Sequence, residues 1–160
     1  IITLILGGPT KYYDYNNENI IKIFSKVNKH LIENNLQLIF VPSNRTPKEI
    51  ITFAKEYFSK NRLIVETVDK KAYLSSLALS KYIVVTCDSS SMISEAALTG
   101  KPVYVAMIPP KRNDKRFKKF RSLFEELNII KELGNELTSW SYKSLDETSR
   151  VASKIKENLK

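Results

Sequence analysis

The chain has 160 residues, and its hydrophobic content of 42% and charged content of 27% are typical of a globular protein with one substantial core. Its net charge of +9 favours an anionic partner over a cationic one. No apolar run approaches the roughly 18 to 20 residues that span a bilayer, and the single cysteine, Cys87, excludes an internal disulfide or a multi-cysteine metal site.

The chain opens on Ile1, already inside the apolar run IITLIL. This run is too short for the hydrophobic region of a signal peptide, and no basic residues precede it. We therefore expect a fragment of a longer protein with something missing upstream. Cys87 follows an apolar run directly and is expected to pack as a small buried residue, and a reducing cytoplasm is the expected location.

Apolar runs rich in β-branched residues alternate with helical patterns along the chain. The predicted strands are 2–6, 37–41, 62–66, 82–86 and 102–108. The predicted helices are 17–35, 47–60, 70–80, 91–99, 113–127 and 145–159, with Pro47 in a first helical turn and Gly100 as a stop signal. This alternation predicts one domain, 1–160, with a doubly wound, mostly parallel α/β sheet. The last helix is amphipathic and is expected to pack back on the domain.

In an open parallel sheet, ligands bind beyond the carboxyl ends of the strands, so the loops after strands are the candidate sites. Gly7 and Gly8 follow the first strand, with Thr10 in the same loop. Paired glycines let the backbone approach an anion closely, or simply make a tight turn. Arg45 and Thr46 precede a helix start and can hold a phosphate there; the alternative is a surface arginine and an N-cap threonine.

The loop at 86–92 is the richest in polar groups. Asp88, Ser89, Ser90 and Ser91 lie between a strand and a helix start, where oriented amides favour an anion by roughly 0.3 to 2 kcal/mol. An N-cap alone explains one of these side chains but not all of them.

Glu95 lies one turn further on and is not explained by a capping box, because the residue three before it is Met92. Ser91 and Glu95 are four apart and share a helix face, which we expect to point toward the same crevice. A carboxylate beside a phosphate site is suited to accept two hydrogen bonds from a ribose diol. The small residues that follow, down to Gly100, suit a helix that lies close on the sheet.

The segment 111–121, KRNDKRFKKFR, carries seven basic residues and one acid, a net +6. This charge fits an anionic membrane surface or another anionic partner, or simply a solvated helix face. Phe117, Phe120, Phe124 and Leu127 form an apolar stripe at helical spacing and are expected to anchor in the core. A nucleic-acid partner is disfavoured, because these aromatics fall on the stripe and not on an exposed stacking face.

The loop and helix after the fourth strand resemble the nucleotide-sugar signature in the C-terminal half of GT-B glycosyltransferases. The matching residues are Asp88-Ser89-Ser90-Ser91-Met92, Ser94-Glu95-Ala96-Ala97 and Gly100-Lys101-Pro102. The resemblance implies that the serine loop takes the diphosphate and Glu95 the ribose. A nucleotide-diphosphate sugar would then bind as substrate, with no cofactor.

More closely, the chain resembles the family of bacterial and plant proteins named for mitochondrial fission, the elongated-mitochondria (Elm1-like) family. The residues that match its motifs are Gly7-Gly8, Ser43 with Arg45-Thr46-Pro47, the stretch 84–97, Gly100 to Tyr104, Arg116-Phe117 with Phe120, and Trp140-Ser141-Tyr142 with Leu145-Asp146 and Thr148. Ser144 departs from the proline expected there. The resemblance implies a two-domain GT-B protein, of which this chain holds the Rossmann-like C-terminal half and lacks the N-terminal half that carries the acceptor site.

No catalytic residue can be assigned from the sequence. His30, the only histidine, lies mid-helix and is expected on the helix surface, so no Ser-His triad can form. The D-x-D pair of many metal-dependent sugar transferases is absent, and no metal site is predicted. Trp140 is expected to be a packing anchor.

Two functions of different class follow. The first is the nucleotide-sugar-binding domain of a GT-B-like glycosyltransferase, acting at the cytoplasmic face of the inner membrane, where segment 111–121 would approach anionic lipid. This half alone is not expected to catalyse transfer. The second is a non-catalytic interaction module that recruits a partner or membrane through its basic surface. Nucleotide binding that depends on Glu95 separates the two.

Overall fold

A computed structural model describes residues 1–58, 62–145 and 147–159. The described strands are β1 (Ile2–Leu6), β2 (Leu38–Pro42), β3 (Arg62–Ile64), β4 (Tyr82–Thr86), β5 (Val103–Ala106) and β6 (Ile130–Glu132). The described helices are α1 (Asn17–Glu33), α2 (Lys48–Tyr57), α3 (Lys70–Leu79), α4 (Ser90–Ala97), α5 (Lys115–Glu126) and α6 (Glu147–Asn158).

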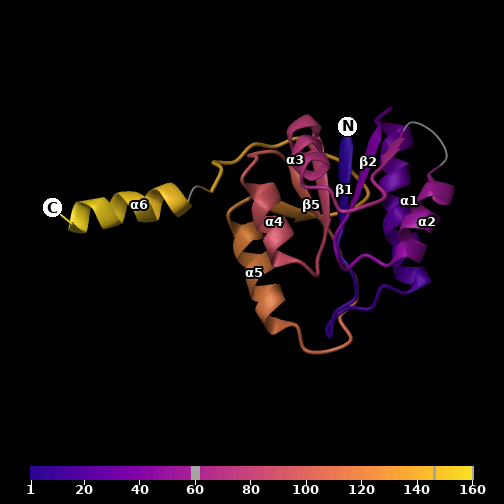
Figure 1. The fold of residues 1–160 in the computed structure, drawn as a ribbon, viewed down its shortest axis with the longest axis horizontal. Coiled ribbons are helices and arrows are strands. Elements are labelled where there is room, and N and C mark those ends of the chain that lie inside the picture. The colour runs from indigo at the N-terminus through magenta and orange to yellow at the C-terminus, as the bar shows by residue number, and fades with distance from the viewer. Residues whose placement is uncertain (59–61, 146, 160) are drawn as a thin grey trace.

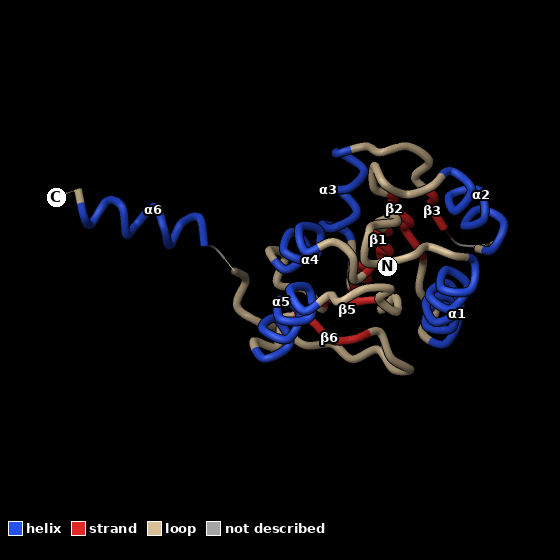
Figure 2. Tube along the Cα trace, turned by 90° about the horizontal axis from the view of Figure 1, so that it is seen from below, coloured by secondary structure: helices blue, strands red, loops and turns tan. Residues whose placement is uncertain are grey.

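The strands form one six-stranded sheet in the order β3-β2-β1-β4-β5-β6, and every described pair is parallel. Helices α1 and α2 cover one face, and α3, α4 and α5 cover the other (Figures 1 and 2). The predicted doubly wound α/β fold is confirmed, and the sheet is parallel throughout. Strand order reverses between the neighbours β1 and β4, so the crevice of this fold opens beyond the carboxyl ends of these two strands.

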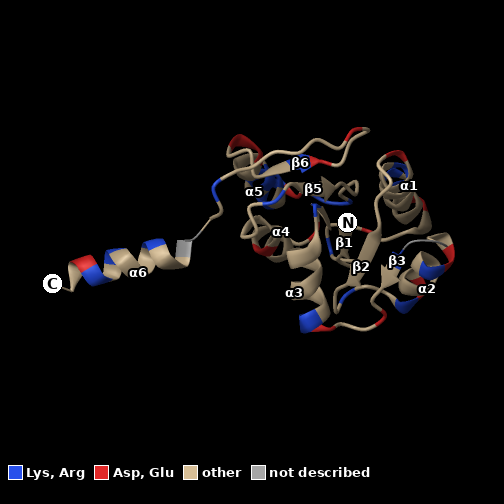
Figure 3. Cartoon of the chain, turned by 90° about the horizontal axis from the view of Figure 1, so that it is seen from above, with Lys and Arg blue, Asp and Glu red and all other residues tan. Residues whose placement is uncertain are grey.

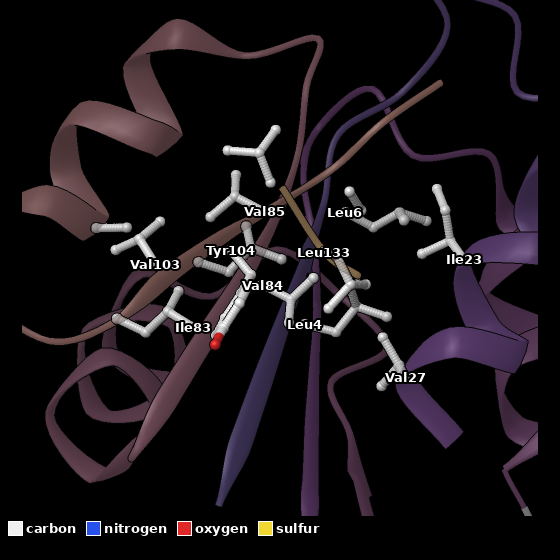
Figure 4. Close-up of a cluster of buried hydrophobic side chains, with 14 of the residues drawn as sticks. Leu4, Leu6, Ile23, Val27, Ile83, Val84, Val85, Val103, Tyr104 and Leu133 are labelled. Carbon is white, nitrogen blue, oxygen red and sulfur yellow. The ribbon is translucent and has the colours of Figure 1, made fainter. Parts of the chain in front are cut away.

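Coverage on both faces explains the continuously apolar strands. Each residue of β1, β2, β4 and β5 is buried. Figure 4 shows Leu4 and Leu6 of β1 beside Ile23 and Val27 of α1, and all four side chains are at most 3% exposed. Full burial of each such side chain stabilises the fold by about 1.5 to 3 kcal/mol.

The predicted elements are correct in type and differ in their boundaries. Strands β3 and β5 end two residues earlier than predicted, at Ile64 and Ala106, and α2 begins after Pro47, which is its N-cap. Predicted helical residues 59, 60 and 146 lie outside the described residues. Strand β6 was not predicted, because three residues of which only Ile130 is buried make too short a pattern.

Two placements inferred from the sequence are wrong. His30 is 1% exposed, with its Nε2 3.0 Å from the carbonyl oxygen of Gly134, because it continues the buried stripe of α1 through Ile20, Ile23 and Val27. Helix α6 does not pack back on the domain; it projects away from it, and Val151 and Ile155 of its apolar stripe are 47% and 53% exposed (Figure 1). An amphipathic pattern predicts the stripe but not what covers it. No helix in the described part of the chain is long and apolar enough to cross a membrane.

Candidate functional site

The loops after β1 and β4 are joined by hydrogen bonds at the point where strand order reverses. The Gly7 amide donates to Thr86 Oγ1 at 2.8 Å, and the Gly8 amide donates to Asp88 Oδ2 at 3.3 Å. Both contacts are buried. The amides of the two glycines, which were considered as a close-approach site for an anion or as a tight turn, are therefore directed to protein acceptors.

Only glycine fits at either position. A Cβ on Gly7 would lie 2.2 Å from Asp88 Oδ2, and one on Gly8 would lie 2.0 Å from the carbonyl oxygen of Arg45. The glycines therefore permit close approach, as expected, but to the chain's own Asp88 and Arg45 loop.

Asp88 is the centre of this network. It is 4% exposed and accepts a hydrogen bond from the Tyr15 hydroxyl, whose oxygen also lies 2.8 Å from Thr86 Oγ1. Arg45 Nη2 lies 2.7 Å from Asp88 Oδ2, and Arg45 Nη1 donates to the Gly8 carbonyl at 2.9 Å. The side chain of Arg45 remains 40% exposed, so its other N–H groups can still donate to a ligand. Burial, followed by the charge of Asp88, raises the pKa of Tyr15, which stays protonated at neutral pH.

Thr10 and Thr46 shape the loops around this network. Thr10 Oγ1 accepts from the amides of Tyr12 and Tyr13, both at 3.1 Å. Thr46 is 9% exposed, and its hydroxyl lies 2.6 Å from the Gly7 carbonyl oxygen and accepts from the Ser43 amide at 2.9 Å. The alternative reading of Thr46 as an N-cap is wrong, because Pro47 occupies that position without a side-chain hydrogen bond.

The three serines of the β4–α4 loop divide into one cap and two that follow it. Ser89 is the N-cap of α4 and accepts from the Met92 amide at 3.4 Å. Ser90 and Ser91 form the first turn and are at least partly exposed. The positive end of the α4 dipole and these two hydroxyls therefore lie beside Asp88 and its partner Arg45.

Glu95 and Ser94 lie one turn further along α4, both on its solvent-accessible surface. Glu95 lines a groove of about 730 Å³ between α3 and α4, together with Lys70 and Tyr73 of α3. Burial, then the adjacent Glu95 carboxylate, raises the pKa of Tyr73. A carboxylate, a phenol and a cation thus line one open groove between α3 and the second half of α4.

Lys101 fixes the other end of this groove. Its Nζ donates to the carbonyls of Leu77 at 2.8 Å and Ala78 at 2.5 Å, and so caps the C-terminal end of α3. Ala96 and Ala97 are fully buried against the sheet, as expected for small residues. Gly100 has a different role from close packing: its φ of 68° turns the chain, and a Cβ there would come no closer than 3.8 Å to Tyr142.

The basic segment 111–121 is not all on the surface. Arg121 is 6% exposed and donates to the Tyr13 hydroxyl and Asp114 Oδ2, both at 3.1 Å, while Tyr13 donates to Asp114 at 2.6 Å. This triad ties the β1–α1 loop to α5. The Tyr13 hydrogen bond, then Arg121, lowers the pKa of Asp114.

The aromatic stripe of α5 packs as predicted in part. Phe124 is buried, and Phe117 and Phe120 pack against the core, but Leu127 is 50% exposed because α5 ends at Glu126. Trp140 is a packing anchor, with its ring edge-to-face on Tyr104 at 5.0 Å.

The described residues contain no group of three or more His, Cys, Asp or Glu side chains placed to hold a metal ion. Cys87 is 1% exposed, as predicted, and burial raises the pKa of its thiol to about 11, so it is not a poised nucleophile. Reasoning from the sequence missed Tyr15, Tyr73 and Thr86. Thr86 could have been found from the sequence, because it is the last residue of a predicted strand, where ligand-binding loops begin. The local sequence around Tyr15 and Tyr73 carries no such signal.

Comparison with known proteins identifies relatives along the whole chain. The model of the family described as "Mitochondrial fission ELM1" matches residues 1–159. An uncharacterized protein of Rickettsia prowazekii is 34% identical over an alignment of 165 residues, gaps included, which covers 98% of this chain and 46% of that protein. The mitochondrial fission protein ELM1 of Arabidopsis thaliana is 37% identical over 90 residues, which cover 54% of this chain and 21% of that protein. The chain therefore spans less than half the length of these relatives.

Solved structures with the same fold include UDP-sugar enzymes. The UDP co-structure of MnaA from S. aureus matches with a TM-score of 0.61 and 17% identity, over 96% of this chain and 36% of that one. The UDP-GlcNAc 2-epimerase of Neisseria meningitidis, bound to UDP-GlcNAc, matches with a TM-score of 0.53 and 16% identity, over 84% of this chain and 32% of that one. At this identity the likeness concerns the fold: a Rossmann-like domain of the GT-B kind.

Proposed function

This chain is a member of the mitochondrial fission ELM1 family with a GT-B-like, Rossmann-like fold, and on that premise we propose that it is the nucleotide-sugar-binding half of a glycosyltransferase-like protein. The observation that carries the proposal is the position of Glu95, in an open groove between α3 and α4 and one turn beyond the first turn of α4. The first turn of α4 follows β4 directly and adjoins the strand-order reversal, which is where ligands bind in open parallel sheets.

The groups needed by each part of a nucleotide follow one another along α4. The first turn, with Ser90 and Ser91, offers amides and hydroxyls to the diphosphate, and Arg45 offers its remaining N–H groups. One turn further, Glu95 accepts hydrogen bonds from the two ribose hydroxyls. The apolar walls of the groove between α3 and α4 then receive the base.

The Arg45–Asp88 ion pair restricts where a diphosphate can bind. The buried Asp88 carboxylate compensates part of the Arg45 charge and disfavours an anion bound directly over it. A diphosphate would therefore bind at the α4 side of Arg45, where the helix dipole adds to the attraction.

Isothermal titration calorimetry with UDP, GDP, ADP and their sugar conjugates tests this function. We expect binding of at least one nucleotide and a weakening of about tenfold to a hundredfold in Glu95→Gln, because hydrogen bonds to a charged group contribute roughly 1.5 to 3 kcal/mol. Glu125→Gln, on the exposed face of α5, is the matched control.

A second comparison isolates the ribose assignment. The native chain is expected to prefer the ribonucleotide over its 2′-deoxy form, and Glu95→Ala is expected to lose this preference. If both forms bind equally to the native chain, the ribose role of Glu95 is wrong. If no nucleotide binds at all, the non-catalytic interaction module becomes the better account.

A further inference from the structure

Five basic side chains in and just before the start of α5 have no acidic partner among the described residues. Within the described part of the chain, Lys111 pairs with Asp14, and Arg121 is buried with Asp114. The remaining cations of the segment 111–121 are exposed and form no ion pair there: Arg112, Lys115, Arg116, Lys118 and Lys119. Figure 3 shows these charges as blue bands over α5 and the loop before it.

This concentration of positive charge does not stabilise α5. Four of the five cations lie in the first five residues of α5, at the positive end of the helix dipole, where cations are unfavourable. They also repel one another at helical spacing. An external anionic surface would offset both costs.

Exposed leucines lie on the same flank of α5 as two of these cations. Leu123 and Leu127 are 52% and 50% exposed. Leu123 shares a shallow surface depression with Arg116 and Lys119, four to seven residues before it. Basic residues next to exposed leucines on one helix flank match the interface of a bilayer, which offers anionic headgroups above an apolar layer.

The basic start of α5 lies at the same edge of the sheet as the candidate site. The loop before α5 follows the carboxyl end of β5 and is bonded to the loop after β1, with the Lys111 amide donating to the Tyr12 carbonyl at 2.8 Å. Figure 1 shows these two loops side by side at the lower edge of the domain. A surface that binds the basic end of α5 therefore lies close to the crevice after β1 and β4.

We propose that one flank of α5, with its basic residues at the start of the helix and Leu123 and Leu127 further along, docks the domain on an anionic lipid bilayer. This docking turns the carboxyl edge of the sheet toward the membrane. The aromatic rings of α5 pack against the core, so this flank lacks the exposed stacking face that single-stranded nucleic acid uses. The docking stands without the proposed function. Its consequence rests on that function: the acceptor of the sugar is then a molecule anchored in the bilayer.

Co-flotation of the 160-residue chain with phosphatidylcholine vesicles, with and without phosphatidylserine, tests the docking. We expect binding only to the anionic vesicles and a decline as salt is raised, because exposed charges are screened. The triple variant Lys115→Glu, Arg116→Glu, Lys119→Glu is expected to bind at least on the order of a hundredfold more weakly, since each basic residue near such a surface contributes about a factor of five.

The control variant Lys29→Glu, Lys55→Glu, Lys81→Glu makes the same change of net charge toward the amino ends of the strands, away from the proposed membrane-facing edge, and is expected to retain binding. Leu123→Ser with Leu127→Ser keeps the charge and is expected to weaken binding as well. Failure of the native chain to bind anionic vesicles overturns the proposal and leaves the flank to an acidic protein. Equal losses in both triple variants also overturn it, because net charge and not this surface then governs binding. Calorimetry with the nucleotide panel, without vesicles, is independent of either result.

Discussion

Arg45 Nη2 lies 2.7 Å from Asp88 Oδ2, and this contact joins the loops after β2 and β4 across the carboxyl end of β1. The carboxylate is buried and the guanidinium is 40% exposed, so the pair is open to a ligand from the arginine side only. Asp88 therefore positions Arg45, while Tyr15 and the Gly8 amide hold Asp88.

A double-mutant cycle of Tyr15→Phe and Asp88→Asn measures this network. Each single change is expected to destabilise the chain, because it leaves buried polar groups with fewer partners, by about 1 to 3 kcal/mol. Urea unfolding should give a coupling energy of roughly 0.5 to 3 kcal/mol between the two sites. Strictly additive losses would show that the Tyr15–Asp88 contact does not contribute to stability.

Gly7→Ala is expected to destabilise the fold severely, by about 3 kcal/mol or more, since a Cβ at Gly7 overlaps a buried carboxylate. Gly134→Ala is the matched control. A Cβ at Gly134 meets nothing within 4 Å, so this change is expected to stay within about 0.5 kcal/mol. Thermal unfolding of the two variants compares them directly, and similar melting temperatures would contradict the close approach at Gly7.

Asp114 predicts a pH dependence of stability. Its pKa is lowered from 3.8 in the folded chain, chiefly by the Tyr13 hydrogen bond, so the folded state binds fewer protons than the unfolded state as this group titrates. The stabilisation is present above a pH of about 4 and is lost as the pH falls through the lowered value. Asp114→Asn should therefore reduce the loss of stability between neutral and acidic pH.

Tyr13→Phe tests the cause of that effect. It removes the hydrogen bond that lowers the pKa of Asp114 most and keeps the Arg121 pair. Urea unfolding across the acidic range should give an intermediate pH dependence. A profile as steep as that of the native chain would assign the effect to Arg121 instead.

The fold class follows from the amino-acid pattern alone. Short apolar strands alternating with amphipathic helices specify a parallel sheet covered on both faces, and the period and composition of such elements are local properties. The stop at Gly100 and the presence of an N-cap among residues 88–91 were predictable for the same reason, since caps and turns depend on neighbouring residues, although the helix starts at Ser90 and not at the predicted residue 91. The family motifs likewise located the candidate ligand-binding stretch 88–95.

Only the tertiary structure decided what these residues contact. The partners of Gly7, Gly8, Arg45 and Thr46 come from other strand-end loops, and no spacing along the chain encodes them. The same is true of Arg121, which the sequence grouped with surface charges. Tyr13 comes 108 residues earlier in the chain and still contacts Arg121, because the parallel sheet brings the carboxyl ends of β1 and β5 to one edge. Periodicity shows which face of a helix is apolar or charged, but the assembled sheet decides whether that face is buried, paired or left open, as α5 and α6 show.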